Sequence, residues 1–485
     1  MPLPRHKTKI VATIGPASES PEMLVRLIRA GMNIARLNFS HGDFAGHQTR
    51  IDRLREAERV TGRRVSILAD LPGPKMRVGE IRPEPIDLRA GDPFFLTTEP
   101  GVGDARRVSV TFEQLPLVVR PGDRLFLNDG LIQLEVRSTQ GHEVECRVQV
   151  GGELRSRKGL NLPGINLGIS AFTPRDRECL EFALRAGVDA VSQSFVEGAA
   201  DLHAVREAAR ALGRVPFIIA KMERARALEN LDAILAAADG IMVARGDLGV
   251  EVPIESIAMT QKRLVAKANL AGKPVITATQ MLESMVVSRL PTRAEATDVA
   301  NAILDGTDAV MLSAESAMGR YPEEAVQMLA RIAEATEAGR PATHLRQLHD
   351  TCHESSTPSA GERFAEVIEQ ALESVPCATA LVPTKTGTTA RLLSRFKPRV
   401  WITALSPDPA VCQGLQFSYG VHPVEQTEDP EDWGAFARSW TREQDLTGNL
   451  ALLVAGPSAR NPRSHHRLEF LPLGDQAGEP AEHPA

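Results

Sequence analysis

The sequence predicts an α/β protein: a closed (β/α)8 barrel of the TIM-barrel type, with an inserted all-β domain and a C-terminal α/β domain. Three observations carry this prediction. Short apolar runs rich in Val and Ile alternate with amphipathic stretches, the alternation occurs eight times, and it is interrupted once by a segment without a helical pattern. The same alternation also fits a doubly wound open sheet. The runs cover residues 10–14, 32–37, 65–69, 190–195, 215–220, 240–244, 274–277 and 309–312.

The stretches between the apolar runs carry helix-start signals. Thr173 and Pro174 precede an expected helix over 175–186, and Thr292 precedes one over 293–304. A Thr cap and a Pro in the first turn satisfy or remove amide donors that a helix start leaves unpaired. The amphipathic stretches are therefore expected to be the helices that cover the barrel.

Domain boundaries are expected where the alternation stops. Between the third and fourth runs, turn dipeptides separate alternating strands and no convincing helix is visible. After the eighth run, a stretch rich in Pro, Ser, Thr and His indicates a linker with room for one helix, and βα alternation then resumes. We expect the barrel at 1–71 and 161–345, the β insert at 72–160, a linker within 337–362, the C-terminal domain at 346–473 and a disordered Pro- and His-rich tail at 474–485. Within the C-terminal domain we expect a helix at 364–373, a strand at 378–382, a helix at 388–396 and a strand at 400–404.

Composition narrows the class of protein. Of 485 residues, 42% are hydrophobic and 24% are charged, with a net charge of -6. This balance is typical of a globular protein and argues against a nucleic-acid binder that relies on bulk charge. No uncharged run of about 18 residues predicts a membrane span, and no apolar core of a secretory signal follows the N-terminus. The 5 cysteines are scattered without metal-type spacing. We therefore expect a cytoplasmic protein with reduced thiols and no nucleic-acid or membrane partner.

Polar and charged residues directly follow the apolar runs. A parallel barrel gathers the carboxyl ends of its strands on one face, so these residues are expected to meet there. The set holds more cations, carboxylates and hydroxyls than a structural rim needs, which predicts an active site. Its members are Thr13, Arg36, Asn38, Ser40, Asp70, Ser194, Lys221, Glu223, Arg245, Asp247, Thr279, Gln280, Ser313 and Glu315.

Two carboxylates at consecutive strand ends, Glu223 and Asp247, are the candidate metal ligands. They repel each other unless a cation lies between them, and oxygen ligands without a His or Cys cluster favour Mg²⁺ or Mn²⁺. The alternative is that each pairs with an arginine such as Arg224 or Arg245. Lys221 lies two residues before Glu223 and faces the same side of an extended segment. It is suited to neutralise an oxyanion, and its alternative is a solvated lysine at a strand end.

Six segments of the sequence stand out: TKIVATIGP at 8–16, AGMNIARLNFSHG at 30–42, KGLNLPG at 158–164, IMVARGDLG at 241–249, ATQMLESM at 278–285 and PTRAE at 291–295. Together they resemble the pyruvate kinase family. The likeness extends over the expected barrel and insert and is looser in the C-terminal domain. It implies a (β/α)8 barrel with the insert acting as a lid, and an enzyme that moves the phosphoryl group of phosphoenolpyruvate to ADP, giving pyruvate and ATP.

The resemblance also implies residue roles. Glu223 and Asp247 would hold Mg²⁺ or Mn²⁺, and Lys221 would offset charge on the transferring phosphoryl group and on the enolate. Arg36 would grip the phosphoryl group, while Thr279 would contact the substrate carboxylate and orient the proton-donating water. The remaining implied residues are Ser313 in the proton relay, the amides of Gly246 and Asp247 on the carboxylate, and Asn38, His41, Arg77 and Lys158 for the nucleotide phosphates. Self-association as a homotetramer is implied as well.

One departure concerns potassium. Many members of the family hold K⁺ with residues matching Asn38, Ser40 and Asp70, and the segment that starts at that aspartate reads DTKGPE. Here it reads DLPGPK, which places Lys75 where the family often has a glutamate. This resembles the lysine-bearing subset that works without potassium. We therefore expect K⁺ not to be required, because a tethered ammonium supplies the positive charge.

The C-terminal domain offers one candidate effector site. A loop before the expected helix at 388–396 suits a phosphate, because amides at a helix start attract anions. In the family this loop contributes to an allosteric phosphate site, whereas residues 456–463 lack the family's usual pattern. A bare helix cap is the alternative. The loop residues are Thr384, Lys385, Thr386, Gly387 and Thr388.

Two other functions were weighed. One is another magnesium-dependent barrel enzyme that handles an enolpyruvate or 2-keto acid, such as an aldolase or a mutase. Such enzymes need no nucleotide lid and do not commonly carry the KGLNLPG segment. The other is a catalytically silent regulatory homologue, which the presence of every expected ligand and cation argues against.

Overall fold

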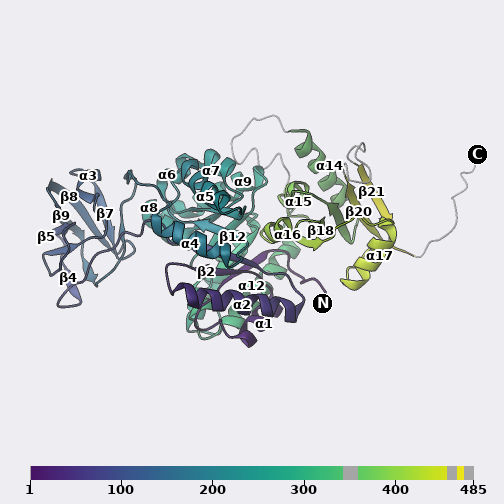
Figure 1. The fold of residues 1–485 in the computed structure, drawn as a ribbon, viewed down its shortest axis with the longest axis horizontal. Helices are drawn as coiled ribbons and strands as arrows, with labels where there is room; N and C mark the ends of the chain where they lie inside the picture. The colour runs from purple at the N-terminus through teal and green to yellow at the C-terminus, as the bar shows by residue number, and fades with distance from the viewer. Residues whose placement is uncertain (1, 342–358, 456–466, 475–485) are drawn as a thin grey trace, which may run out of the picture.

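The computed structural model describes residues 2–341, 359–455 and 467–474 (Figure 1). Eight strands form a closed barrel in the order β1-β16-β15-β14-β13-β12-β3-β2. Neighbouring strands pair in parallel, as in β1 with β16 and β13 with β14. The closed sheet confirms the barrel and excludes the doubly wound open sheet. The strands are β1 (Lys9–Thr13), β2 (Met32–Asn38), β3 (Ser66–Leu71), β12 (Ala190–Gln193), β13 (Phe217–Met222), β14 (Gly240–Ala244), β15 (Val275–Ala278) and β16 (Ala309–Leu312).

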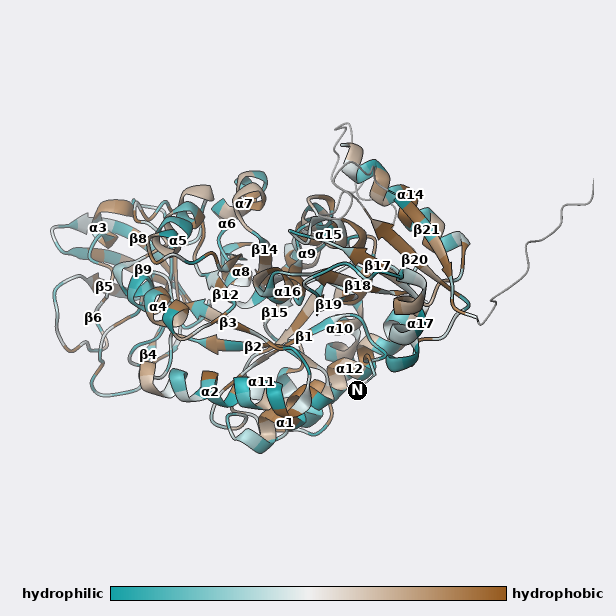
Figure 2. Cartoon of the chain, turned by 45° about the vertical axis from the view of Figure 1, so that its right-hand side comes forward, coloured by the Kyte–Doolittle hydropathy of each residue, from teal (hydrophilic) through white to brown (hydrophobic). Residues whose placement is uncertain are grey.

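Helices cover the outside of the barrel, and their apolar faces pack on the strands in one large core. Figure 2 shows the contrast between brown barrel strands and the more hydrophilic outer surface of helices such as α2. In chain order the helical segments are α1 (Pro21–Ala30), α2 (Phe44–Thr61), α4 (Pro174–Arg185), α5 (Ala199–Ala211), α6 (Ala225–Glu229), α7 (Leu231–Ala237), α8 (Arg245–Glu251), η1 (Ile254–Ser256), α9 (Ile257–Leu270), η2 (Glu283–Val286), α10 (Arg293–Leu304), α11 (Ala314–Ala317) and α12 (Pro322–Gly339).

The segment between β3 and α4 forms a separate β domain with its own core. A six-stranded sheet runs in the order β11-β7-β8-β9-β5-β6, and β10 pairs with β4. One short helix, α3 (Leu115–Val118), corrects the expectation of no helix there; a single turn is too short to leave an apolar period in the sequence. The strands are β4 (Ile86–Leu88), β5 (Pro93–Thr97), β6 (Arg107–Ser109), β7 (Arg124–Leu127), β8 (Ile132–Gln140), β9 (Glu143–Val150), β10 (Gly152–Leu154) and β11 (Leu160–Asn161).

The C-terminal domain is a five-stranded sheet in the order β19-β18-β17-β20-β21, with β21 antiparallel to β20. It lies on the opposite side of the barrel from the β insert (Figure 1). Its elements are α14 (Ala360–Ser374), β17 (Thr379–Pro383), α15 (Thr388–Ser394), β18 (Trp401–Ser406), α16 (Pro409–Leu415), β19 (Val421–Glu425), α17 (Trp433–Glu443), β20 (Leu450–Ala455) and β21 (Arg467–Pro472).

Several element ends differ from the sequence-based expectations. Helix α10 has the expected bounds, because Thr292 and Glu295 form a capping box at its start. The strand expected at 215–220 instead spans Phe217–Met222. Both ends of the expected linker at 337–362 are helical, since α12 continues to Gly339 and α14 begins at Ala360. Residues 342–358 of that linker and 475–485 of the expected tail lie outside the described residues. Among the described residues, no helix is long and apolar enough to cross a membrane.

Asp308, at the start of β16, joins the barrel to the C-terminal domain. Its Oδ1 accepts a hydrogen bond from the Tyr419 amide at 2.9 Å and lies 2.7 Å from Lys397 Nζ. Its Oδ2 accepts from the Val275 amide at 3.1 Å. The Lys397 side chain is 0% exposed. A buried ammonium group has no access to water, so its carboxylate partner is what makes its charge tolerable there.

We predict that Asp308→Asn destabilises the protein. The substitution leaves the buried Lys397 ammonium without its counter-ion, which costs about 3–5 kcal/mol of unfolding free energy. Denaturant unfolding checks this, with Asp52→Asn on the exposed face of α2 as the matched control. Equal unfolding midpoints for the two variants would contradict the assignment.

Candidate active site

A cavity of about 350 Å³ opens at the carboxyl ends of the barrel strands, between the barrel and the β insert. Strands β2, β3, β13 and the loops after β12 and β14 supply its barrel side, as expected for a barrel of this type. The insert contributes the opposite wall. Its charged and polar lining residues are Arg36, Asn38, Ser40, Asp70, Lys75, Arg77, Asp129, Lys158, Asn161, Ser194, Lys221, Glu223 and Asp247.

Lys221 lies at the centre of this set. Its Nζ is 2.7 Å from Glu223 Oε1 and 3.4 Å from Asp70 Oδ1, and it donates to Ser194 Oγ at 2.7 Å. Burial alone would lower the pKa of Lys221, but the carboxylates of Asp70 and Glu223 outweigh it and raise that pKa. The expected shared face of Lys221 and Glu223 is therefore present as a direct ion pair. The lysine is a fixed cation, not a solvated one.

Asp70 holds the two cations of the cavity floor together. Arg36 donates to Asp70 Oδ2 through Nε at 3.0 Å and Nη2 at 2.5 Å, and Ser192 donates to Oδ1 at 2.7 Å. A third nitrogen of Arg36 donates to Thr13 Oγ1 at 2.9 Å. Burial would raise the pKa of Asp70, but Lys221 and Arg36 lower it to about 2. The carboxylate thus stays charged and fixes the direction of Arg36.

Glu223 and Asp247 are the acidic pair. Glu223 Oε2 accepts from the Phe195 amide at 2.8 Å, which orients its carboxylate. Burial, and after it the charge of Glu223, raise the pKa of Asp247 to about 6. Both carboxylates line the same cavity, and a bound cation would relieve their mutual repulsion. Within the described residues, no group of three or more His, Cys, Asp and Glu side chains could hold a metal, so any ion here would take further oxygen ligands from elsewhere.

Arg224 and Arg245 were the alternative partners for the acidic pair, but each of them is bound to another carboxylate. Arg224 Nη1 lies 2.8 Å from Glu251 Oε1, and Arg245 Nη1 lies 2.7 Å from Asp298 Oδ2. Arg224 also donates to the carbonyl of Ile165 at 2.9 Å, in the segment that returns from the insert to the barrel. Its role is thus to fix that return segment. The donor set of two carboxylates beside a lysine fits a hard divalent ion such as Mg²⁺ or Mn²⁺.

Lys75 lines the cavity together with Asn38, Ser40 and Asp70. Asn38 Oδ1 accepts the Ser40 amide at 3.1 Å. Burial lowers the pKa of Lys75, and Arg77 lowers it further, while Asp70 is the first of the carboxylates that oppose this. The ammonium group therefore lies in the same electrostatic field as the three residues expected to match a monovalent site.

Not all of the residues expected at the nucleotide phosphates line the cavity. Arg77 and Lys158 line it, and Arg77 Nη1 donates to the carbonyl of Arg157 at 2.8 Å. His41 is not among the lining residues. Burial first, and then the charges of Lys75, Arg77 and Arg36, lower the pKa of His41, which shows that it stands beside this cationic group.

Gly246, Thr279 and Ser313 also do not line the cavity, and neither do Thr13, Arg245, Gln280 and Glu315 of the wider strand-end set. Gly246 and Thr279 touch, since a Cβ added to Gly246 would lie 2.8 Å from Thr279 Cγ2. Thr279 has φ +75°, a left-handed conformation that is costly for a β-branched residue and typical of functional loops. The Ser313 amide donates to Glu315 Oε2 at 2.7 Å, and Glu315 Oε1 accepts the Leu282 amide at 3.1 Å. Glu315 therefore links the loops that carry Thr279 and Ser313.

Ser194 and Asp129, which line the cavity, make interactions that were not expected from the sequence. Ser194 accepts the Lys221 hydrogen bond, and Asp129 reaches the site from the insert. The charge of Asp129 contributes to the raised pKa of Asp247, after burial and Glu223. Its only sequence signal was an Asp-Gly turn dipeptide, and the turn does place Asp129 at φ +56°.

In the C-terminal domain, the candidate effector loop precedes α15, a helix of seven residues. Gly387 caps it at φ +77°, and its amide donates to Thr384 Oγ1 at 3.0 Å. The hydroxyls of Thr386 and Thr388 bond to each other at 2.9 Å. Residues 456–463, the other expected half of that site, lie outside the described residues.

We predict that divalent-ion affinity depends on pH through Asp247. Its pKa of about 6 lies above the ordinary 3.8, so a proton competes with the ion when the pH falls below 6. Affinity for Mn²⁺, measured by electron paramagnetic resonance, should be level above pH 7 and fall about tenfold per pH unit below 6. Asp247→Asn should bind weakly without that slope. An affinity that does not change between pH 7 and pH 5 in the wild type would contradict this reading.

Comparisons with known proteins agree with this geometry. The family description "Pyruvate kinase, barrel domain" matches residues 5–326, and "Pyruvate kinase, alpha/beta domain" matches residues 362–464. The chain is 51% identical to the pyruvate kinase of Thermococcus litoralis, over 88% of this chain and 90% of that protein. It is 43% identical to pyruvate kinase 2 of Synechocystis, over 94% of this chain and 77% of that protein. A crystal structure of a pyruvate kinase from Cryptosporidium parvum superposes with a TM-score of 0.89 at 34% identity, covering 97% of both chains. The chain therefore belongs to the pyruvate kinase family.

Proposed function

We propose that the cavity residues carry out the family's reaction, the transfer of the phosphoryl group of phosphoenolpyruvate to ADP, as follows. The observation that carries the proposal is the contact of Lys221 with Glu223, 2.7 Å apart, in the cavity that also holds Asp247 and Arg36. Both substrates are polyanions, so their approach requires fixed positive charge. The carboxylates fix that charge in place and stay available for a metal.

Arg36 and Lys221 bind the phosphoryl group. The Arg36 guanidinium, held by Asp70 and Thr13, offers planar donors to the phosphoryl oxygens. Lys221 stays protonated and offsets the negative charge that passes to the enolate when the phosphorus–oxygen bond breaks. Its effect grows toward the transition state, because the enolate oxygen gains charge along the reaction.

Glu223 and Asp247 would hold the divalent ion, Mg²⁺ or Mn²⁺. When bound, such an ion supplies Lewis-acid charge to substrate oxygens. The amide that orients Glu223, from Phe195, keeps its carboxylate directed into the cavity. The amides of Gly246 and Asp247 bind the substrate carboxylate at the start of α8.

Thr279 and Ser313 serve the second half-reaction, protonation of the enolate. Thr279 contacts the substrate carboxylate and orients the water that donates the proton, and Ser313 belongs to the relay. The left-handed backbone of Thr279 and the Glu315 link between the two loops support this assignment. Both features fix the loops before substrate binds.

The β insert closes over the nucleotide. Arg77 and Lys158 come from its two connections to the barrel, and Asn38 and His41 face them from the end of β2. Closure brings these groups to the ADP phosphates and expels water, which protects the phosphoryl donor from hydrolysis. We further propose a cytoplasmic homotetramer, and a phosphate effector at Thr384–Thr388. Nothing in the comparisons favours an aldolase, a mutase or a silent regulatory homologue.

We predict that Lys221→Met lowers turnover strongly and has a smaller effect on substrate affinity. Loss of one preorganised charge at a developing oxyanion costs about 10²–10³ in kcat. A coupled assay for ATP formation from phosphoenolpyruvate and ADP measures this. Lys262→Met, which removes a half-exposed lysine on α9, is the matched control and should leave kcat within a factor of two. Unchanged turnover in Lys221→Met would refute the assigned role.

We predict that activity does not require potassium. The Lys75 ammonium occupies the field of Asp70 and replaces the charge of a free ion. The same assay, run with Mg²⁺ in tetramethylammonium buffer, should show little change when K⁺ is added. Lys75→Glu should become K⁺-dependent by more than tenfold. If the activity of the wild-type enzyme depended more than tenfold on K⁺, potassium independence would be disproved. The proposed phosphoryl transfer would still stand.

A further inference from the structure

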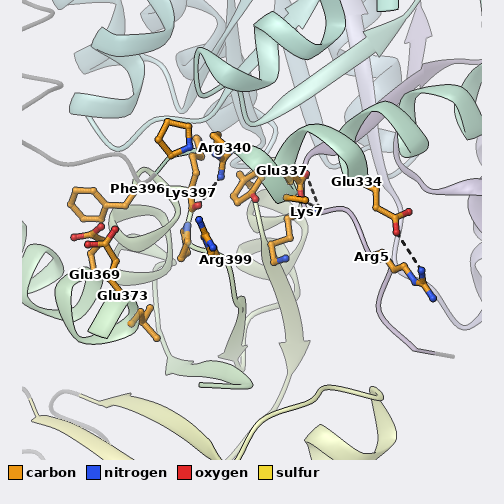
Figure 3. Close-up of a pocket in the computed structure, with 15 residues that line it drawn as sticks. Arg5, Lys7, Glu334, Glu337, Arg340, Glu369, Glu373, Phe396, Lys397 and Arg399 are labelled. Carbon is orange, nitrogen blue, oxygen red and sulfur yellow. Dashed lines mark hydrogen bonds and ion pairs between the residues drawn. The ribbon is translucent and has the colours of Figure 1, made fainter. Parts of the chain in front are cut away.

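A second cavity, of about 630 Å³, lies between the barrel and the C-terminal domain. The N-terminal segment, the end of α12, the second half of α14, and the loop after α15 line it (Figure 3). It opens near the amino ends of β1 and β16, whereas the active site lies at the carboxyl ends of the strands. The two cavities share no lining residue.

Arg340 is the main cation of this second cavity. It is 6% exposed, its guanidinium stacks on the Tyr419 ring at 4.5 Å, and Nη2 donates to the carbonyl of Lys397 at 2.6 Å. The other terminal nitrogen, Nη1, is buried and has no hydrogen-bond partner among the described residues. Leaving a buried, charged donor without an acceptor costs free energy. Arg340 Nη1 therefore needs an acceptor that the described residues do not supply.

Lys7 stands beside Arg340 and adds a second positive charge. Burial lowers the pKa of Lys7; Glu337 opposes this, and the nearby charge of Arg340 lowers it further. Glu337 is already occupied, because its carboxylate accepts the amides of Lys7 at 2.8 Å and Thr8 at 2.7 Å and the Thr8 hydroxyl at 2.7 Å. Glu337, the carboxylate that acts on Lys7, is thus already used by these other donors.

The other charged side chains that line the cavity limit the charge that a ligand can carry at each end. Lys397 is paired with Asp308 at 2.7 Å and is not available. Arg399 is exposed and faces the same part of the cavity as Lys7 and Arg340, while Glu369 and Glu373 of α14 lie at the other end (Figure 3). A ligand with negative charge at one end fits this arrangement. A ligand with negative charge at both ends would meet the glutamates.

We propose that this cavity binds a small oxyanion, a phosphate or a carboxylate, through Arg340 and Lys7 with Arg399 at the rim. The anion would supply the acceptor that Arg340 Nη1 lacks and would relieve the repulsion between the two cations. It would contact the N-terminal segment and α12 of the barrel, and the loop after α15 of the C-terminal domain. Binding would therefore hold the two domains together at a place remote from the chemistry.

The chain carries its own reporter, because only 2 tyrosines occur in the sequence, Tyr321 and Tyr419. Tyr419 lines this cavity and Tyr321 does not. Full-length protein labelled with 3-fluorotyrosine would give two ¹⁹F signals, assigned with Tyr321→Phe. Titration with sodium phosphate or sodium acetate at constant ionic strength should shift the Tyr419 signal saturably and leave Tyr321 unmoved. A shift with phosphate alone identifies a phosphate site, and a shift with acetate identifies a carboxylate site.

Variants tie the shift to this cavity. Arg340→Gln should weaken anion affinity at least tenfold, and Lys7→Gln should weaken it severalfold while Lys7→Arg retains it. Arg137→Gln, on the half-exposed face of β8 in the insert, is the control and should bind as the wild type does. The proposal fails if neither anion moves the Tyr419 signal. It also fails if Lys7→Gln binds the anion as tightly as the wild type, a test that does not depend on the folding of Arg340→Gln.

Discussion

The active site depends on a single buried carboxylate, Asp70. Two cations, Arg36 and Lys221, are held at the floor of a desolvated cavity, and charges of the same sign do not remain there without a counter-charge between them. Asp70 supplies it, with Oδ2 on Arg36 and Oδ1 on Lys221 and Ser192. Because Asp70 lies near the carboxyl end of β3, the barrel itself sets the spacing of the two cations. Lys221 contacts both Asp70 and Glu223, so two carboxylates share the balancing of its charge.

The two ends of the barrel have different tasks. At the carboxyl ends, charged side chains line an open cavity, and left-handed residues such as Thr279 hold the loops in place. At the amino ends, Asp308 and the Lys397 ammonium are paired and buried, and they attach the C-terminal domain. The Arg340 cavity beside this junction is the exception, since one buried nitrogen of Arg340 has no hydrogen-bond partner among the described residues.

Much of the fold followed from sequence periodicity, because strands buried on both faces need continuous apolar runs and helices need a 3.6-residue period. The shared face of Lys221 and Glu223 was predictable from their spacing of two on an extended segment, whereas their direct ion pair was not. The place of Asp129 was not predictable either, since a β insert places its turns by sheet register, which no local pattern fixes. The Arg340 cavity was also out of reach, because its residues come from the N-terminal segment, α12, α14 and the loop after α15, and only the docking of two domains brings them together.

We propose that Glu223 and Asp247 share one divalent ion beside Lys221. Anomalous scattering from crystals grown with Mn²⁺ and a non-transferable analogue of the enolate would locate that ion. We expect the strongest anomalous peak between the two carboxylates, with an oxygen of each in the coordination sphere. A peak elsewhere, with Glu223 and Asp247 both free of metal, would contradict it.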